Sequence, residues 1–94
     1  MLTFELLKEL VKFDGETPLF RGVCGGLSRI DVCMQDGMMI LDEDIQDLVK
    51  VKTVDDLRQL IGKFEDMPVF LTDGGVLREI SEVVAQSSIC VIGD

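Results

Sequence analysis

Carboxylates are the most abundant side chains in this sequence that could do chemistry. The chain has 18 Asp and Glu residues against nine Lys and Arg, which gives a formal net charge of −9. Four of the carboxylates, Asp42, Glu43, Asp44 and Asp47, lie in one short stretch. A hard cation such as Ca²⁺ needs several oxygens in a fixed loop, and this stretch lacks the sixth-position glycine and twelfth-position glutamate of an EF-hand. The sequence therefore favours a solvated acidic linker over a metal site.

The nucleophilic side chains lack the partners that would activate them. The chain contains three cysteines, Cys24, Cys33 and Cys90, and no histidine. Without histidine, neither a Ser-His-Asp triad nor a Cys-His pair can form. The odd number of cysteines and their apolar neighbours predict three reduced thiols rather than disulfides. We therefore expect no cofactor, and we rank an enzyme that works with carboxylates alone below a binding function.

The strong negative charge restricts the partners that we expect. A surface this acidic repels phosphate backbones and anionic lipids, so we expect neither nucleic acid nor a membrane as ligand. It suits a basic protein partner, and it also keeps a small protein soluble. No apolar run is long enough to cross a bilayer, and the first residues lack the basic region of a secretory signal. The sequence therefore predicts a cytoplasmic protein.

The elements that must position these side chains repeat along the chain. A shift of 50 residues, without a gap, lays residues 2–30 over residues 52–80. The identical pairs are Thr3/Thr53, Leu7/Leu57, Leu10/Leu60, Pro18/Pro68, Phe20/Phe70, Gly25/Gly75, Leu27/Leu77, Ile30/Ile80 and Asp44/Asp94. The alternative is two unrelated α-β pieces with similar patterns. We interpret the chain as one domain with repeat one at 1–41, a linker at 42–51 and repeat two at 52–94.

Each predicted repeat begins with a helix. The helices are expected near 3–13 and 53–65, with Thr3 and Thr53 as N-caps and a proline after each helix. The core-facing stripes are expected to be Phe4, Leu7 and Val11 in the first helix, and Val54, Leu57, Ile61 and Phe64 in the second.

Three strands are expected to follow each helix. Short apolar runs at 18–23 and 68–72 lead through glycine turns to return strands at 27–34 and 76–84, and then to last strands at 38–41 and 89–92. The predicted fold class is α+β: two tandem α-β-β-β repeats with pseudo-twofold symmetry, whose helices pack on an antiparallel sheet.

One difference between the two predicted helices bears on interaction. Three apolar residues of the first helix, Leu2, Leu6 and Phe13, lie over charged residues in the 50-residue shift. At about 100° per residue they share one narrow arc, so something must cover them. The linker, read as a short helical turn, offers Ile45, Leu48 and Val49 for this purpose. The alternative is a second subunit or a partner, so we expect a monomer or a homodimer.

The stretch at 53–83 also resembles a pattern found in small phage and bacterial proteins. These read T-V-x-x-L, then a leucine-rich helix, then P-V and short strands, and the resemblance covers both halves of this chain, the second more closely. It implies a small α+β module without an assigned activity, and it supplies no functional residues. Some small acidic phage proteins inhibit host factors such as CRISPR complexes by covering basic surfaces. That comparison is an analogy from size and charge.

These observations together favour a non-catalytic protein that binds other proteins. The hypothesis is an acidic interaction protein, phage-encoded in its most specific form, that inhibits a nucleic-acid-binding complex of the host. The alternative is a small-ligand or metal-responsive regulatory module. The candidate partner-binding residues are Asp42, Glu43, Asp44, Asp47, Asp55, Asp56, Leu2, Leu6 and Phe13.

Overall fold

This computed structural model describes residues 1–43 and 49–94. These residues contain two short helices and nine strands. The fold class is α+β, as predicted. The elements are α1 (Thr3–Leu10), β1 (Leu19–Val23), β2 (Gly26–Ser28), β3 (Ile30–Gln35), β4 (Met38–Asp42), β5 (Val49–Val51), α2 (Val54–Ile61), β6 (Val69–Asp73), β7 (Val76–Glu79), β8 (Glu82–Gln86) and β9 (Ile89–Gly93).

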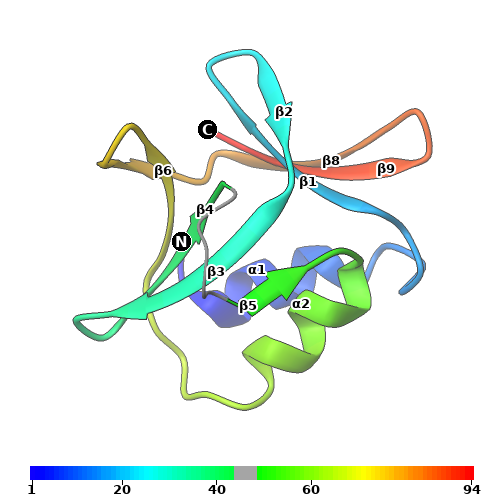
Figure 1. Ribbon diagram of the computed structural model, residues 1–94. Coiled ribbons are helices and arrows are strands. Elements are labelled where there is room, and N and C mark those ends of the chain that lie inside the picture. Colours follow the sequence, from blue (N-terminus) through cyan, green and yellow to red (C-terminus); the bar gives the residue numbers. More distant parts are fainter. Residues whose placement is uncertain (44–48) are drawn as a thin grey trace.

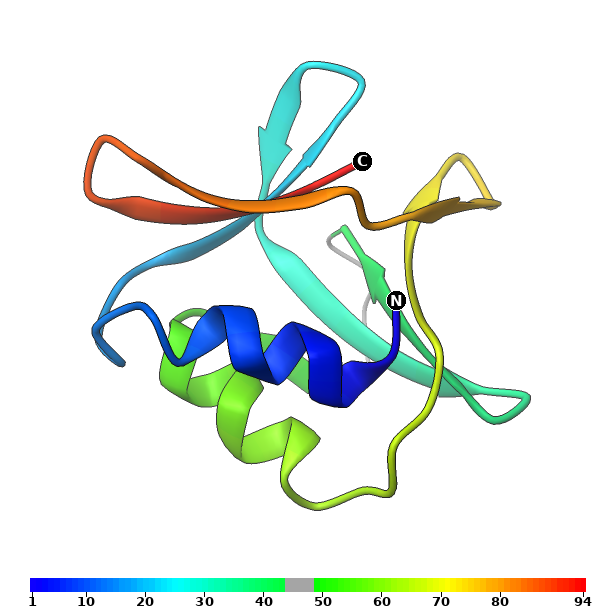
Figure 2. The same ribbon diagram turned by 180° about the vertical axis from the view of Figure 1, so that it is seen from behind.

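The strands form two twisted sheets, and the two helices lie together on one side of them (Figures 1 and 2). The strand orders are β2-β1-β9-β8 and β5-β3-β4-β6-β7. Each stretch that the sequence predicts as one return strand is two strands, because the chain crosses between the sheets there. It passes from β2 in the four-stranded sheet to β3 in the five-stranded sheet, and from β7 in the five-stranded sheet to β8 in the four-stranded sheet. Each half therefore has four strands after its helix rather than three.

The sheets are mixed, so the expectation of an antiparallel sheet is wrong. β1 runs parallel to β9, with Leu19 opposite Cys90, and β4 runs parallel to β6, with Met39 opposite Val69. The remaining pairs are antiparallel. Strands joined by a tight hairpin must be antiparallel, but β1 and β9 come from different halves of the chain and are free of that constraint.

The contacts between the halves come in matched pairs. The Thr3 amide donates to the Met67 carbonyl at 2.8 Å, and the Val54 amide donates to the Thr17 carbonyl at 3.0 Å. Similarly, the Met39 amide donates to the Pro68 carbonyl at 2.8 Å, and Cys90 to Pro18 at 2.9 Å. The first strand of each half thus lies beside the last strand of the other half, in the same register.

The first hairpin of each half keeps the offset along the chain that the sequence repeat predicts. In β1–β2 Arg21 lies opposite Ser28. In β6–β7 the corresponding residues are Leu71 and Arg78, which also lie opposite each other. The first hairpins of the two halves therefore have the same register at the 50-residue offset.

The helices and the second hairpins, β3–β4 and β8–β9, correspond when the chain is shifted by one residue more than in the sequence alignment. In β3–β4 Asp31 lies opposite Asp42, and this pair corresponds to Glu82 opposite Gly93 in β8–β9. The helices begin at Thr3 and at Val54, rather than at the two aligned threonines. We call residues matched when they correspond at these structural offsets.

The expected N-cap at Thr3 is therefore wrong, whereas Thr53 does cap α2. Thr53 Oγ1 accepts from the Asp56 amide at 3.2 Å. The cap position of α1 is Leu2, which has no side-chain acceptor, and its amide donates to Glu5 Oε1 at 2.9 Å. Thr3 is instead buried one residue into the helix, where its hydroxyl donates to Asp66 at 3.2 Å.

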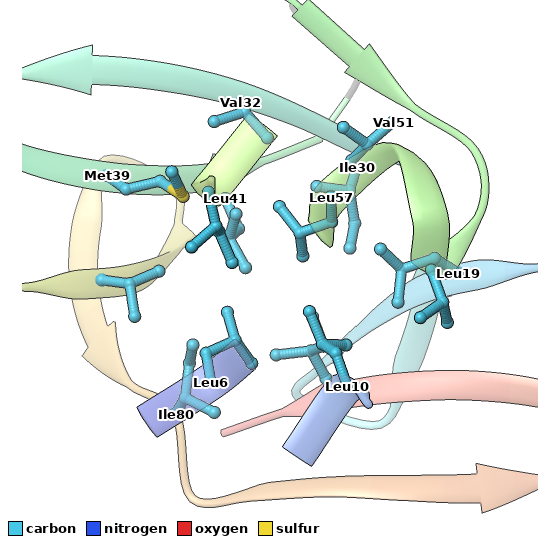
Figure 3. Close-up of a cluster of buried hydrophobic side chains, with 14 of the residues drawn as sticks. Leu6, Leu10, Leu19, Ile30, Val32, Met39, Leu41, Val51, Leu57 and Ile80 are labelled. Carbon is cyan, nitrogen blue, oxygen red and sulfur yellow. The ribbon is translucent and has the colours of Figure 1, made fainter. Parts of the chain in front are cut away.

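One hydrophobic core fills the space between the helices and both sheets (Figure 3). Leu6 and Leu10 point into it from α1 and face Leu41 and Leu57. All four side chains are 0% exposed. Burying each such side chain contributes roughly 1.5–3 kcal/mol, so these four stabilise the attachment of the helices to the sheets.

A buried arginine ties the two sheets together. Arg21 on β1 is 3% exposed, and its Nη1 donates to the Leu41 carbonyl at 2.6 Å and to Thr72 Oγ1 at 3.1 Å. Its Nη2 donates to the Thr72 carbonyl. Both acceptor residues belong to the other sheet. At the matched position of the second half stands Leu71, which is 0% exposed.

The predicted linker is partly a strand. Val49–Val51 pairs antiparallel with β3 and is not helical, because its extended backbone extends that sheet by one strand. Ile45 and Leu48, the other residues expected to cover the first helix, lie outside the described residues.

Candidate functional site

The four clustered carboxylates of the sequence lie at the end of β4 and beyond it. Asp42 is half-buried, and its side chain accepts from the Glu43 amide at 2.8 Å, which fixes the end of the strand. Glu43 is exposed. Asp44 and Asp47 lie outside the described residues. Within residues 1–43 and 49–94, no three Asp, Glu or Cys side chains are grouped so that they could hold a metal ion.

Asp55 and Asp56 lie in the first turn of α2, where each has a local structural partner. Asp55 forms an ion pair with Arg58 at 3.3 Å. The Asp56 carboxylate accepts from the Lys52 and Thr53 amides at 2.9 and 3.1 Å, and these bonds lower its pKa. Negative charge at a helix N-terminus also favours the helix. The structure therefore gives the exposed Asp56 a capping role, whereas Asp55 is half-buried and is paired with Arg58.

The apolar stripe predicted on the first helix does not exist as a stripe. Leu6 is fully buried in the core, which excludes it as a partner contact and corrects that prediction. Phe13 is half-buried against the core, and Leu2 is 41% exposed. The error comes from the gapless alignment, because the structure matches Leu6 with the equally buried Leu57.

The true apolar difference between the helices lies on another face of α1. Phe4 is 45% exposed, Leu7 is half-buried and packs against the core, and Val11 is 56% exposed, so the prediction of a core-facing stripe is wrong for Phe4 and Val11. The matched positions of these three residues in α2 are Asp55, Arg58 and Gly62, two of which form an ion pair. The gapless alignment concealed this difference, because it paired Leu7 with Leu57, which is a core residue of α2.

A groove of about 730 Å³ lies beside β5 and contains charged residues that the sequence analysis missed. Arg29, Lys50 and Lys52 line it together with Asp31 and Glu43. The Arg29 guanidinium lies over the Phe20 ring at 4.5 Å. In a chain of net charge −9, this is a local concentration of positive side chains.

Asp31 gives this groove an unusual acceptor. The side chain is 2% exposed, and its Oδ2 atom has no hydrogen-bond partner among the described residues. An unsatisfied buried acceptor costs about 1–3 kcal/mol, so a donor that reached it would bind favourably. The alternation Ile30-Asp31-Val32 predicts Asp31 on the open face of its strand, and the strand instead buries all three residues.

The hairpin turns place one thiol beside a carboxylate. Cys24 adopts a φ of 53°, and Gly74 at the matched position has a φ of 56°. Cys24 Sγ donates to Asp73 Oδ2 at 3.2 Å, and this hydrogen bond raises the pKa of the thiol. Burial raises the pKa of Cys90 to about 11. Neither group is therefore prepared as a thiolate nucleophile at neutral pH.

No protein-family model, curated protein or solved structure matches the chain. None of the helices in the described part is both long and apolar enough to cross a membrane.

Proposed function

We propose that this chain is a non-catalytic binding protein that recognises a basic surface on another protein. The observation that carries the proposal is the acidic character of the helical side of the molecule. The two helices and the loops that follow them hold eight carboxylates and four cations, namely Glu5, Glu9, Asp14, Glu16, Asp55, Asp56, Glu65 and Asp66 against Lys8, Lys12, Arg58 and Lys63.

The matched contacts gather these carboxylates from distant parts of the sequence. The Asp55 amide donates to the Gly15 carbonyl at 2.9 Å, so the loop with Asp14 and Glu16 lies at the start of α2. The Phe4 amide donates to Asp66 Oδ1 at 2.9 Å, so the loop with Glu65 and Asp66 lies at the start of α1. Each helix N-terminus therefore presents an acidic surface built from both halves.

Such a surface speeds association with a basic partner and makes binding sensitive to salt. A nucleic-acid-binding complex has basic surfaces of this kind, so in its most specific form the proposal is an inhibitor, phage-encoded, that covers such a surface in the cytoplasm of a host. Supporting features are the net charge of −9 and the raised pKa of the Cys24 and Cys90 thiols, which disfavours a thiolate nucleophile.

The proposal predicts capture of basic proteins that depends on the helical side. The immobilised protein should retain basic host proteins at low salt and release them as salt rises. The double variant Asp14→Lys, Glu16→Gln should lose most of this capture. The matched control is Asp36→Lys together with Gln86→Lys in the distant hairpin turns. Equal capture by the test and control variants would contradict an interface on the helical side.

We also propose that the two halves are copies of one unit, related by pseudo-twofold symmetry. The support is the set of matched hydrogen bonds and strand registers that recur in both halves. The contact between the two halves then corresponds to the interface of a homodimer whose two subunits are joined in one chain. We therefore expect the intact chain to be a monomer. Sedimentation at several concentrations tests this, and a concentration-dependent mass would contradict it.

The groove beside β5 supports a second candidate, a module that binds a small zwitterion. Asp31 offers a buried acceptor for an ammonium group, and Arg29 offers a donor for a carboxylate or phosphate. Titration with free amino acids, followed by NMR shifts of residues 28–31, tests this function. The variant Asp31→Asn should abolish the response, and a response that survives it would contradict the assignment.

A further inference from the structure

The outer edges of the two sheets differ in how well they are protected. The edge strands β2 and β5 have three residues each, and β7 has four, with Arg78 held by Asp73 at 3.0 Å. β8 has five residues, Glu82–Gln86, and its only charge is at the first of them. Short strands, prolines and charges are what normally keep edges from accepting another strand. β8 is therefore the least protected edge in the described part of the chain.

The matched strand in the first half shows how such an edge is filled. β3 corresponds to β8, because Asp31 opposite Asp42 matches Glu82 opposite Gly93. The outer edge of β3 is covered by β5, which pairs antiparallel to it. In that pair Lys50 lies opposite Asp31, with a valine on each side of the lysine. The molecule thus contains one example of a Val-Lys-Val strand, and it pairs with the edge of β3 that corresponds to the outer edge of β8.

The backbone of β8 is oriented to accept such a strand. Residues Ser87 and Ser88 have φ values of 48° and 72°, so they form a two-residue hairpin turn in which Gln86 and Ile89 are a hydrogen-bonded pair. Hydrogen-bonded pairs alternate along an antiparallel ladder. The N–H and C=O groups of Val83 and Ala85 therefore point away from β9, toward the outer edge. Ala85 is exposed and Val83 is half-buried.

The charges near this edge favour a cationic strand. Beside β5, the helix α2 contributes Asp56 and Leu60 to a groove that also contains Lys50 and Lys52. The matched residues of α1, which lies against β8, are Glu5 and Glu9. Glu5, Glu9 and Glu82 are thus the carboxylates of α1 and β8, and Lys12 forms an ion pair with Glu9 at 2.8 Å.

We propose that the outer edge of β8 binds an extended segment of the partner protein as an added antiparallel strand, with a lysine or arginine of that segment opposite Glu82. The positive charge of the segment rests on the function proposed above, and the strand pairing rests on β5 and β3. Main-chain hydrogen bonds to Val83 and Ala85 give the affinity, and the cation opposite Glu82 selects the segment.

The test uses the whole chain and two blocked heptapeptides, Thr-Val-Lys-Val-Lys-Val-Thr and the same peptide with both lysines replaced by glutamate. NMR shifts on adding the lysine peptide should be largest for the amides of residues 82–86. The glutamate peptide should bind about fivefold more weakly, because the cross-strand charge pair becomes repulsive. Shifts confined to other parts of the chain would overturn the proposal.

Two variants separate strand addition from general charge attraction. Ala85→Pro removes one outward N–H while leaving the pairs with β9 intact, so it should lose peptide binding at an unchanged circular dichroism spectrum. Glu82→Lys should reverse the preference to the glutamate peptide, whereas the control Asp36→Lys, with the same change of charge, should not. Undiminished binding of the lysine peptide to Ala85→Pro overturns the proposal. So does a dimer in sedimentation, if a second copy of the chain occupies the edge. If basic proteins are still captured at low salt while both peptides fail, strand addition is wrong and the acidic binding function stands.

Discussion

The two halves of this molecule bury the same positions of their helices but differ in the first strand of the sheet. Leu6 and Leu57 are both 0% exposed, and so is Leu71 on β6. The residue that matches Leu71 is Arg21, a buried cation that binds the carbonyls of Leu41 and Thr72. The helix positions are therefore interchangeable between the halves, whereas the sheet interior has specialised.

The surfaces of the halves differ more than their cores. On α1 the exposed Phe4 and Val11 match Asp55 and Gly62 of α2. The edge of β3 is covered by β5, whereas no strand within residues 1–43 and 49–94 pairs with the outer edge of the matching β8. These differences indicate that the core contacts maintain the fold while the edges and helix faces are where the halves interact with different surroundings.

The largest loss of stability should come from placing a charge at the core position that the two helices share. Leu6→Asp and Leu57→Asp each place a carboxylate in the core and should each cost more than about 4 kcal/mol of unfolding free energy. Phe4→Asp is the control, because it copies Asp55 at an exposed position and should change stability by less than about 0.5 kcal/mol. Chemical denaturation measures all three. A stable Leu6→Asp variant would contradict the match of Leu6 with Leu57.

Substitution of Arg21 should cause the next largest loss of stability. Arg21→Ala leaves the Leu41 and Thr72 carbonyls without their buried donor and should cost about 3 kcal/mol. Arg21→Leu copies Leu71 and should cost less, about 1–2 kcal/mol, because it refills the volume and removes a buried charge whose Nε has no partner in the described structure. Denaturant melts give the ranking. An Arg21→Leu variant less stable than Arg21→Ala would mean that the two strand positions are not equivalent.

The sequence predicted the kinds of elements well and their alignment poorly. Hydrophobic periodicity located both helices, and glycine located the turns of three hairpins, because these signals are local. The turn between β8 and β9 consists of Ser87 and Ser88 instead. The core face of α1 was wrong because chance identities such as Leu7/Leu57 favoured a gapless shift, whereas the loop before Pro18 is one residue longer than its counterpart. The parallel pairs β1–β9 and β4–β6 and the buried state of Asp31 depend on contacts between distant segments, which no local pattern records.

The helix caps give a smaller and pH-dependent difference. Asp56→Ala should cost about 1 kcal/mol at pH 7, because it removes the acceptor for the Lys52 and Thr53 amides. The folded pKa of Asp56 is lowered, so its contribution is complete above its ordinary pKa and is lost as the pH falls through the folded value. Thermal melts should therefore show the gap between wild type and variant closing below about pH 4. A constant gap down to pH 2 would contradict the assigned cap.

The smallest effect concerns a turn and leaves stability nearly unchanged. Cys24 donates to Asp73, whose carboxylate raises the pKa of the thiol. Asp73→Asn should lower that pKa and speed alkylation of Cys24 by iodoacetamide at pH 8 about threefold, because the thiolate is the reacting species. The measurement is made in a Cys33→Ser background, with the buried Cys90 as the internal unreactive thiol. Arg78→Gln should have the opposite effect, since the Arg78 cation lowers the pKa of Cys24. If both variants react at the wild-type rate, the contact between the two turns does not control the thiol, and Cys24 differs from Gly74 only in its side chain.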